Sequence, residues 1–188
     1  MTRADGAQIG AEAAARLAAV GTVTIDPGLR DHEFHRLATE FGVEFADDHR
    51  AFLAAGLPVG PSWPDWRGEG RRSLGKRMQM PAEGVLYAVE WQQFWPEGWG
   101  RQPARMKDAL RSARYHLARV PQLIPVCSHH YLPAGRGSFG HPVLSVVQID
   151  VGVRGADLLD YIEAEFGASE RRAAATPPSV SFWSELVS

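Results

Sequence analysis

The sequence predicts an α+β protein in which an antiparallel sheet is flanked by helices, with an extra helix at the N-terminus. Apolar residues recur every three or four positions in 31–41 and 157–166, which is typical of helices with one buried face. They alternate in 143–151, which is typical of a strand. Helices and strands follow one another without a regular strand-helix-strand repeat, which favours α+β over α/β.

Three helices are expected at the start of the chain. Residues 7–20 are rich in alanine but offer little large apolar surface, so we expect a loosely docked helix, with 1–28 as helix and lead-in and 29–188 as a single domain. Asp26 and Pro27 can start a second helix that ends at Gly42. Its buried face comprises Phe34, Leu37, Ala38 and Phe41. A third helix begins near Asp47 and Asp48, buries Phe52 and Leu53, and ends at Gly56.

The middle of the chain is harder to assign. Residues 60–81 contain prolines, glycines, two tryptophans and a basic run, and we expect a long irregular connection. From Gly84 the pattern predicts a strand whose one face is Val85, Tyr87, Val89 and Trp91. Prolines and glycines at 96–103 break regular structure, and 104–120 return to a helix. That helix turns Met106, Leu110, Ala113 and Leu117 inward and carries arginines elsewhere.

The last third supplies the centre of the expected sheet. Residues 123–127 form a short strand and 143–151 a longer, central one, because both of its faces begin apolar. Asp157 opens a helix that ends at Gly167. An alanine-rich linker with Pro177 and Pro178 then leads to a final helical turn that docks Phe182, Trp183 and Leu186.

Composition limits the classes of partner and compartment. Twenty basic and 22 acidic side chains leave a formal charge of −2, so no global field attracts nucleic acid or a membrane. Cys127 is the single cysteine and cannot close an intrachain disulfide. The N-terminal segment has neither the charge nor the unbroken apolar run of a signal peptide or a membrane span. We therefore expect a cytoplasmic protein.

Two motifs suggest ligand chemistry. Gly135, Gly137 and Gly140 match G-x-G-x-x-G, but the loop leads into a strand rather than a helix, so we interpret it as a strand connection. His129, His130 and His141 could converge on a zinc or iron ion, which is the basis of an alternative hypothesis of a metal-dependent enzyme. Adjacent histidines on a strand point to opposite faces, however, and a third ligand from Asp150 or His116 would be needed. We expect no catalytic residue and no cofactor.

Tryptophans and arginines gather in two segments of irregular sequence. Tryptophan and arginine are the side chains that most often anchor protein interfaces. A basic surface with aromatic residues can also stack single-stranded nucleic acid, but net acidity and the lack of an RNA-binding signature argue against that. We therefore expect a protein-binding surface made of Trp63, Asp65, Trp66, Arg67, Trp95, Trp99, Arg101 and Arg105.

Two blocks of the chain resemble the SUKH superfamily. EFGVEFADDHRAFLAAGLPVG, from Glu40, is similar to its N-terminal signature, and LIPVCSHHYLPAGRGSFGHPVLSVVQID followed by GADLLDYIEAEF is similar to its later strands and closing helix. SFWSEL resembles the docking segment that often ends these proteins. The resemblance covers pieces between Phe34 and Leu186. The usual Asn-Gly turn is replaced by Ala55, Gly56 and Leu57, and 60–99 hold more Trp and Pro than the family pattern.

This resemblance implies a strongly bent antiparallel sheet with flanking helices. It also implies a non-catalytic protein-binding domain. Many bacterial members are cytoplasmic immunity proteins that neutralise polymorphic toxins, often nucleases, and other members act as regulators. The family supplies no catalytic residues to carry over. The expected partner is therefore a protein, by this resemblance a toxin domain, and not nucleic acid or membrane.

Overall fold

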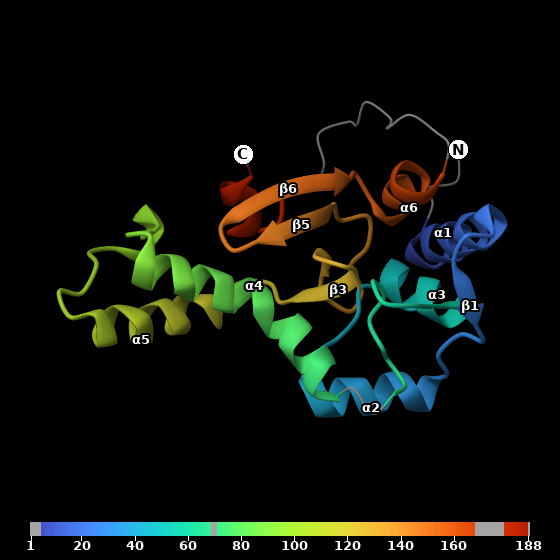
Figure 1. Cartoon of the computed structure of the whole chain (residues 1–188), viewed down its shortest axis with the longest axis horizontal. Coiled ribbons are helices and arrows are strands. Elements are labelled where there is room, and N and C mark those ends of the chain that lie inside the picture. The colour runs from blue at the N-terminus through green and yellow to red at the C-terminus, as the bar shows by residue number, and fades with distance from the viewer. Residues whose placement is uncertain (1–4, 69–70, 168–178, 188) are drawn as a thin grey trace.

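The computed structural model describes residues 5–68, 71–167 and 179–187, and these form the expected α+β arrangement (Figure 1). Its helices are α1 (Gly6–Val20), α2 (Asp31–Phe41), α3 (Asp47–Ala55), α4 (Arg71–Trp91), α5 (Met106–Leu117) and α6 (Leu158–Phe166), with 3-10 turns η1 (Glu97–Trp99) and η2 (Trp183–Leu186). Its strands are β1 (Thr24–Asp26), β2 (Leu57–Val59), β3 (Leu123–Cys127), β4 (His130–Pro133), β5 (Val143–Val147) and β6 (Asp150–Gly155).

The main sheet is an antiparallel meander in the order β3-β4-β5-β6. Its register shifts between Pro125 and Cys127 and between Val143 and Leu144, and such bulges bend a strand. Both faces are covered, because alternate strand residues enter two different clusters. One cluster joins the sheet to α1, α2, α3 and α6, and the other joins it to α4 and the C-terminal segment. A separate pair, β1 with β2, lies beside the first cluster.

Helix α1 packs closely on α3, contrary to the expectation of a loosely docked helix. Gly6, Gly10, Ala13 and Leu17 are all buried on one face. A Cβ atom at Gly10 would overlap the carbonyl oxygen of Asp48, so the two backbones meet there with no room for a side chain. Ala13 and Leu17 share the core cluster of the main domain. Small residues therefore let α1 pack closely on α3, although α1 carries few large apolar side chains.

Helix α2 starts later than Asp26 and Pro27 suggested. Asp26 ends β1, and the helix begins at Asp31 after Arg30. The Glu33 carboxylate accepts a hydrogen bond from the Arg30 amide at 2.8 Å, which satisfies one of the free donors at the helix start. The expected buried residues Phe34 and Leu37 do face the core, whereas Phe41 is only half-buried.

The strand predicted from Gly84 is wrong, because 84–91 belong to α4. The alternating apolar pattern does not mark one face of a strand. Tyr87 and Trp91 are 48% and 67% exposed, while Val85 and Val89 are buried at helical spacing. The irregular connection predicted up to Pro81 also ends early, at the start of α4.

Pro81 lies inside α4 without ending it. A proline has no N–H for the carbonyl four residues earlier, which is that of Arg77. The Tyr131 hydroxyl donates to this carbonyl at 3.1 Å and so replaces the missing donor. Gly84 lets the same helix approach the β5–β6 turn, since a Cβ there would lie 2.6 Å from Cα of Gln148.

The single strand predicted over 143–151 is a hairpin, β5 and β6, with its turn at Gln148 and Ile149. Strand β4 occupies part of what looked like a loop. Helix α6 is capped by Asp157 as expected, and Phe182 and Trp183 are buried in the final turn. The Trp183 indole donates to the Pro121 carbonyl at 2.8 Å, which ties the end of the chain to the start of β3. The predicted linker with Pro177 and Pro178 lies outside the described residues.

Candidate functional site

The eight residues predicted to bind a partner fall into two separate groups. Trp63, Asp65, Trp66 and Arg67 lie in the segment before α4, whereas the other four lie in the connection between α4 and α5, at the far end of the hairpin that these helices form (Figure 1). Trp63 and Trp66 belong to the large core cluster, while Trp95 and Trp99 pack against the cluster between α4 and α5. The predicted surface is therefore not one continuous patch.

Trp63 and Trp66 are core residues rather than exposed anchors. They are 8% and 2% exposed. Trp63 stacks on Phe166 with ring centroids 5.3 Å apart. Trp66 meets the edge of Phe45 at 5.3 Å, and its carbonyl accepts a hydrogen bond from Arg36 at 2.7 Å. Both side chains thus hold their loop against the helices.

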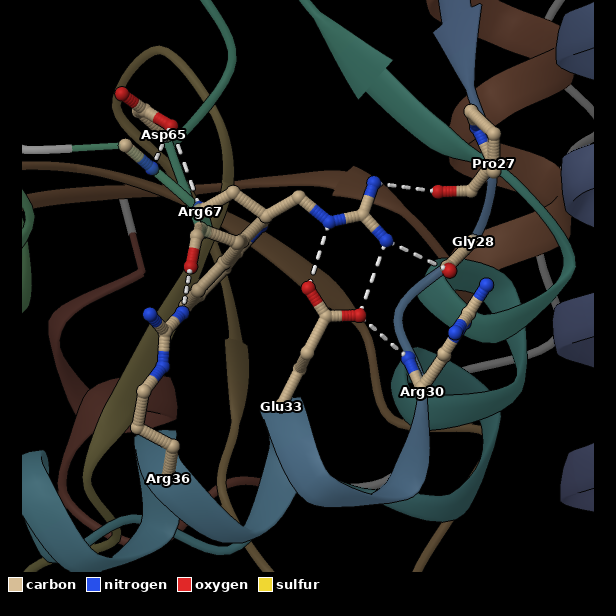
Figure 2. Close-up of polar contacts among 9 residues, drawn as sticks. Pro27, Gly28, Arg30, Glu33, Arg36, Asp65 and Arg67 are labelled. Atoms are coloured by element: carbon tan, nitrogen blue, oxygen red, sulfur yellow. Dashed lines mark hydrogen bonds and ion pairs between the residues drawn. The ribbon is translucent and has the colours of Figure 1, made fainter.

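Arg67 fastens the lead-in of α2 to the loop that precedes α4. Figure 2 shows its guanidinium between Glu33 and two carbonyls: Nε and Nη2 donate to the Glu33 carboxylate at 2.7 and 3.0 Å, and Nη1 and Nη2 donate to Pro27 and Gly28 at 2.6 and 2.8 Å. These hydrogen bonds lower the pKa of Glu33 to about 2. Asp65 accepts from the Gly68 amide at 2.7 Å and shapes the turn. The polar groups of Asp65 and Arg67 are therefore used within the fold.

We expect Arg67→Ala to destabilise the fold by about 2–3 kcal/mol, because the change leaves a carboxylate and two carbonyls without their charged donor. Arg67→Lys should also lose stability, but less than Arg67→Ala does, since an ammonium cannot make the paired hydrogen bonds of a guanidinium. Urea unfolding of the two variants and of Glu33→Gln measures the effect. If Arg67 served only a partner, Arg67→Ala would unfold like the wild type.

The second group also packs largely within the fold. Trp95 and Trp99 are half-buried and meet edge to face, and the Trp95 indole donates to the Gly100 carbonyl at 2.7 Å. Trp99 stacks between His116 at 5.1 Å and Phe182 at 5.7 Å. Arg101 and Arg105 are exposed, and neither forms an ion pair with a described residue. These two arginines are the members of the predicted set that solvent reaches freely.

The glycine-rich loop already holds two carboxylates of its own chain. The Gly137 amide donates to Asp47 Oδ1 at 3.0 Å, and the Gly140 amide donates to Asp48 Oδ2 at 2.8 Å. The Asp47 amide in turn donates to the Ser138 carbonyl at 2.8 Å. The amides that a phosphate would need are therefore bound to the start of α3, in agreement with a strand connection.

The three histidines of the alternative hypothesis do not form one site. His129 lies in the β3–β4 turn rather than on a strand, so its ring is 4.6 Å from that of His130 instead of on the opposite face. His141 lies near Asp48, whose pKa its charge lowers against the larger effect of burial. Within residues 5–68, 71–167 and 179–187, no three His, Cys, Asp or Glu side chains are placed to hold a metal ion.

Three exposed large apolar side chains lie along one side of α4. Met80, Tyr87 and Trp91 are 50%, 48% and 67% exposed. Their spacings of seven and four residues place them in one line along the helix, which we call the α4 stripe. Treating 84–91 as a strand hid this line. The helical spacing of buried Leu74, Met78, Val85 and Val89 is the signal that could have revealed it.

Two carboxylates border the α4 stripe. Glu83 and Glu90 are exposed and follow Met80 and Tyr87 by three residues each, so they lie beside the apolar line. Neither forms an ion pair with any residue that the structure describes. Val147, in the hairpin that Gly84 approaches, is 54% exposed and adds apolar surface nearby. An apolar line with an acidic border suits a protein surface of opposite charge.

Comparison with protein-family models, with curated proteins and with solved structures found no match. The resemblance to the SUKH superfamily stays a prediction. Of the helices that the structure describes, none is both long and apolar enough to cross a membrane.

Proposed function

We propose that this chain is a non-catalytic protein-binding module whose α4 stripe binds a partner protein. The observation that carries the proposal is the exposure of Met80, Tyr87 and Trp91 on a helical hairpin that extends away from the sheet (Figure 1). Large apolar side chains in line on one helix are anchors of the kind that fill pockets in a partner. Arg101 and Arg105 follow α4 and lie outside the proposed surface.

The border of the stripe selects the chemistry of the partner. Glu83 and Glu90 favour a surface that carries lysine or arginine around an apolar centre, because opposite charges steer association and like charges oppose it. A toxin that cleaves nucleic acid must hold a polyanion and therefore carries a basic surface. The proposed partner is thus a basic toxin domain, neutralised in the cytoplasm as the SUKH resemblance implies. The free, buried thiol of Cys127 is compatible with that reducing compartment.

The test compares three immobilised proteins in one lysate of the native host. These are the wild type, a stripe variant with Met80→Ser, Tyr87→Ser and Trp91→Ser, and a control with Tyr115→Ser, which is 58% exposed on α5. We expect a basic protein to be retained by the wild type and the control and lost by the stripe variant. Purified, it should bind the stripe variant at least about a hundredfold more weakly, since each lost anchor costs 1 kcal/mol or more.

Charge reversal provides an independent arm. Glu83→Lys with Glu90→Lys should lower the association rate of the same purified protein at low salt, and added salt should shrink the difference from the wild type. Equal binding of the stripe variant and the wild type would refute the proposal. Retention of further copies of this chain alone would assign the stripe to self-association instead.

A further inference from the structure

An open cavity of about 670 Å³ lies apart from α4 and is lined by five segments that are distant in sequence. Its wall combines Thr22–Thr24, Val59–Trp63, the β3–β4 turn at 127–130, Arg154 of β6 and the end of α6. This volume falls within the range of sites that enclose small molecules. Its lining is about equally polar and apolar, and polar groups from separate elements converge on it, as they do in sites that orient a small molecule.

Arg154 supplies a cation that has no partner among the described residues. Its Nε is buried and has no acceptor in this part of the chain, and its guanidinium forms no ion pair there. Buried donors are almost always bonded, so an unbonded one next to a cavity points to a ligand oxygen near this guanidinium. The charge of Arg154 also reaches His130, where it adds to burial in lowering the pKa.

The paired histidines add hydrogen-bonding groups to the same wall. The Nδ1 atom of His130 and the Tyr161 hydroxyl are hydrogen-bonded at 2.8 Å, which leaves Nε2 of His130 for the cavity. Burial is the main cause that lowers the pKa of His130 to about 4, so this ring is uncharged at neutral pH. His129 lies beside it, with Nδ1 at 3.2 Å from the Ser128 hydroxyl. One permanent cation, Arg154, and one carboxylate, Glu165, therefore line the cavity.

Two aromatic rings supply a flat, apolar part of the wall. Trp63 and Phe166 stack at 5.3 Å with an angle of 25° between their planes, and both line the cavity. A planar ring or a short hydrocarbon chain would lie against them. A dianion such as a phosphate monoester would carry one charge more than Arg154 can balance and would be repelled by Glu165. A singly charged oxyanion matches the charge of Arg154 and meets less repulsion from Glu165 than a dianion does.

We propose that this cavity binds a small monocarboxylate with a planar apolar body. Its carboxylate accepts hydrogen bonds from Arg154 and from the paired histidines, and its body lies against Trp63 and Phe166. The site is independent of the α4 stripe, because no residue of α4 lines it.

The test uses benzoate, the neutral isostere benzamide and phenylphosphate, with the nitrogen-bound protons of Arg154 and the histidines followed by NMR. Benzoate should saturate with a dissociation constant of about 1–10 mM or tighter, as fits a ligand of this size. Arg154→Gln should weaken benzoate at least about tenfold, which corresponds to 1.4 kcal/mol. His129→Ala, in the turn, should weaken it as well, and Arg136→Gln on the exposed glycine-rich loop is the matched control.

Glu165→Gln should increase the affinity for phenylphosphate more than the affinity for benzoate, because it removes the repelling charge. Thermal unfolding of each variant confirms that the fold persists, and His129→Ala keeps the test decisive if Arg154→Gln unfolds. No saturable benzoate signal in that range, benzamide binding as tightly as benzoate, or benzoate affinity that is unchanged in both Arg154→Gln and His129→Ala would overturn the proposal.

Discussion

Stability should fall by about 2 kcal/mol between pH 6.5 and pH 4.5 through one buried side chain, His49. This residue is fully buried on α3, and neither ring nitrogen has a hydrogen-bond partner among the residues that the structure describes. It packs instead against the rings of Phe45 and Trp66, at 5.3 and 6.3 Å. Burial lowers the pKa of His49 from 6.5 to about 3, because the charged ring would lose its hydration without compensation.

The direction of the effect follows from which state takes up the proton first. The unfolded chain binds a proton at His49 below pH 6.5, while the folded protein resists until about pH 3. Stability is thus complete above pH 6.5 and is lost as the pH falls toward 3. His130 acts in the same direction, since its pKa is lowered to about 4. Burial raises the pKa of the adjacent Asp48, which acts in the opposite direction.

His49→Phe isolates this contribution. Phenylalanine fits among the same aromatic rings and removes two buried nitrogens that bond to nothing, so we expect a gain of about 1–2 kcal/mol at pH 7. The variant should also lose much of the slope between pH 6.5 and pH 4.5, while Asp48 and His130 remain as in the wild type. Denaturant unfolding at a series of pH values measures both effects. Parallel curves for the two proteins would show that His49 is not buried uncharged.

Gly10→Ala should destabilise the protein by about 2–3 kcal/mol, although alanine is the better helix former. A Cβ at this position would overlap the Asp48 carbonyl oxygen and lie 2.7 Å from both Cβ of Ala51 and the amide nitrogen of Phe52. The helix α1 would have to withdraw from α3, which would also uncover Ala13 and Leu17. Thermal and urea unfolding give the sign directly. A loosely docked α1 would instead be stabilised by alanine.

Gly75→Ala is the matched control for a helical glycine. A Cβ at Gly75 in α4 would meet only Cε1 of Phe41, at 3.7 Å, which is ordinary contact. Alanine there should raise stability by about 0.5–1 kcal/mol, because it reduces the freedom of the unfolded chain. Opposite signs for the two substitutions would establish that close backbone packing, and not helix propensity, decides the effect at Gly10.

The sequence predicts elements well where a local signal and the tertiary environment agree. Helices α3 and α6 begin and end where Asp47, Gly56, Asp157 and Gly167 indicate. The prediction fails where a distant residue changes the local rule. Pro81 reads as a helix breaker, but the Tyr131 hydroxyl, fifty positions away, satisfies the carbonyl that it leaves free. The sequence of residues 71–91 alone cannot reveal that hydrogen bond, because its donor, Tyr131, lies in β4.

The candidate site was harder to predict for a related reason. Composition shows that tryptophan and arginine are present, but it does not show which of these side chains are buried or bonded within the fold. Arg67 finds its acceptors in Pro27, Gly28 and Glu33, and Trp66 is 2% exposed. The strand interpretation placed Trp91 on the same face as Val85 and Val89, which are buried, whereas Trp91 is 67% exposed. Correct assignment of α4 as a helix would have placed Met80, Tyr87 and Trp91 on one outer face.

Site-specific photocrosslinking tests the central claim, that the α4 stripe is the surface that contacts the partner. A photoreactive phenylalanine analogue replaces Trp91 in one protein and Phe139, which is 39% exposed on the glycine-rich loop, in another. The account predicts an adduct with the captured partner from position 91 and none from position 139. Adducts from position 139 with none from position 91 would contradict it.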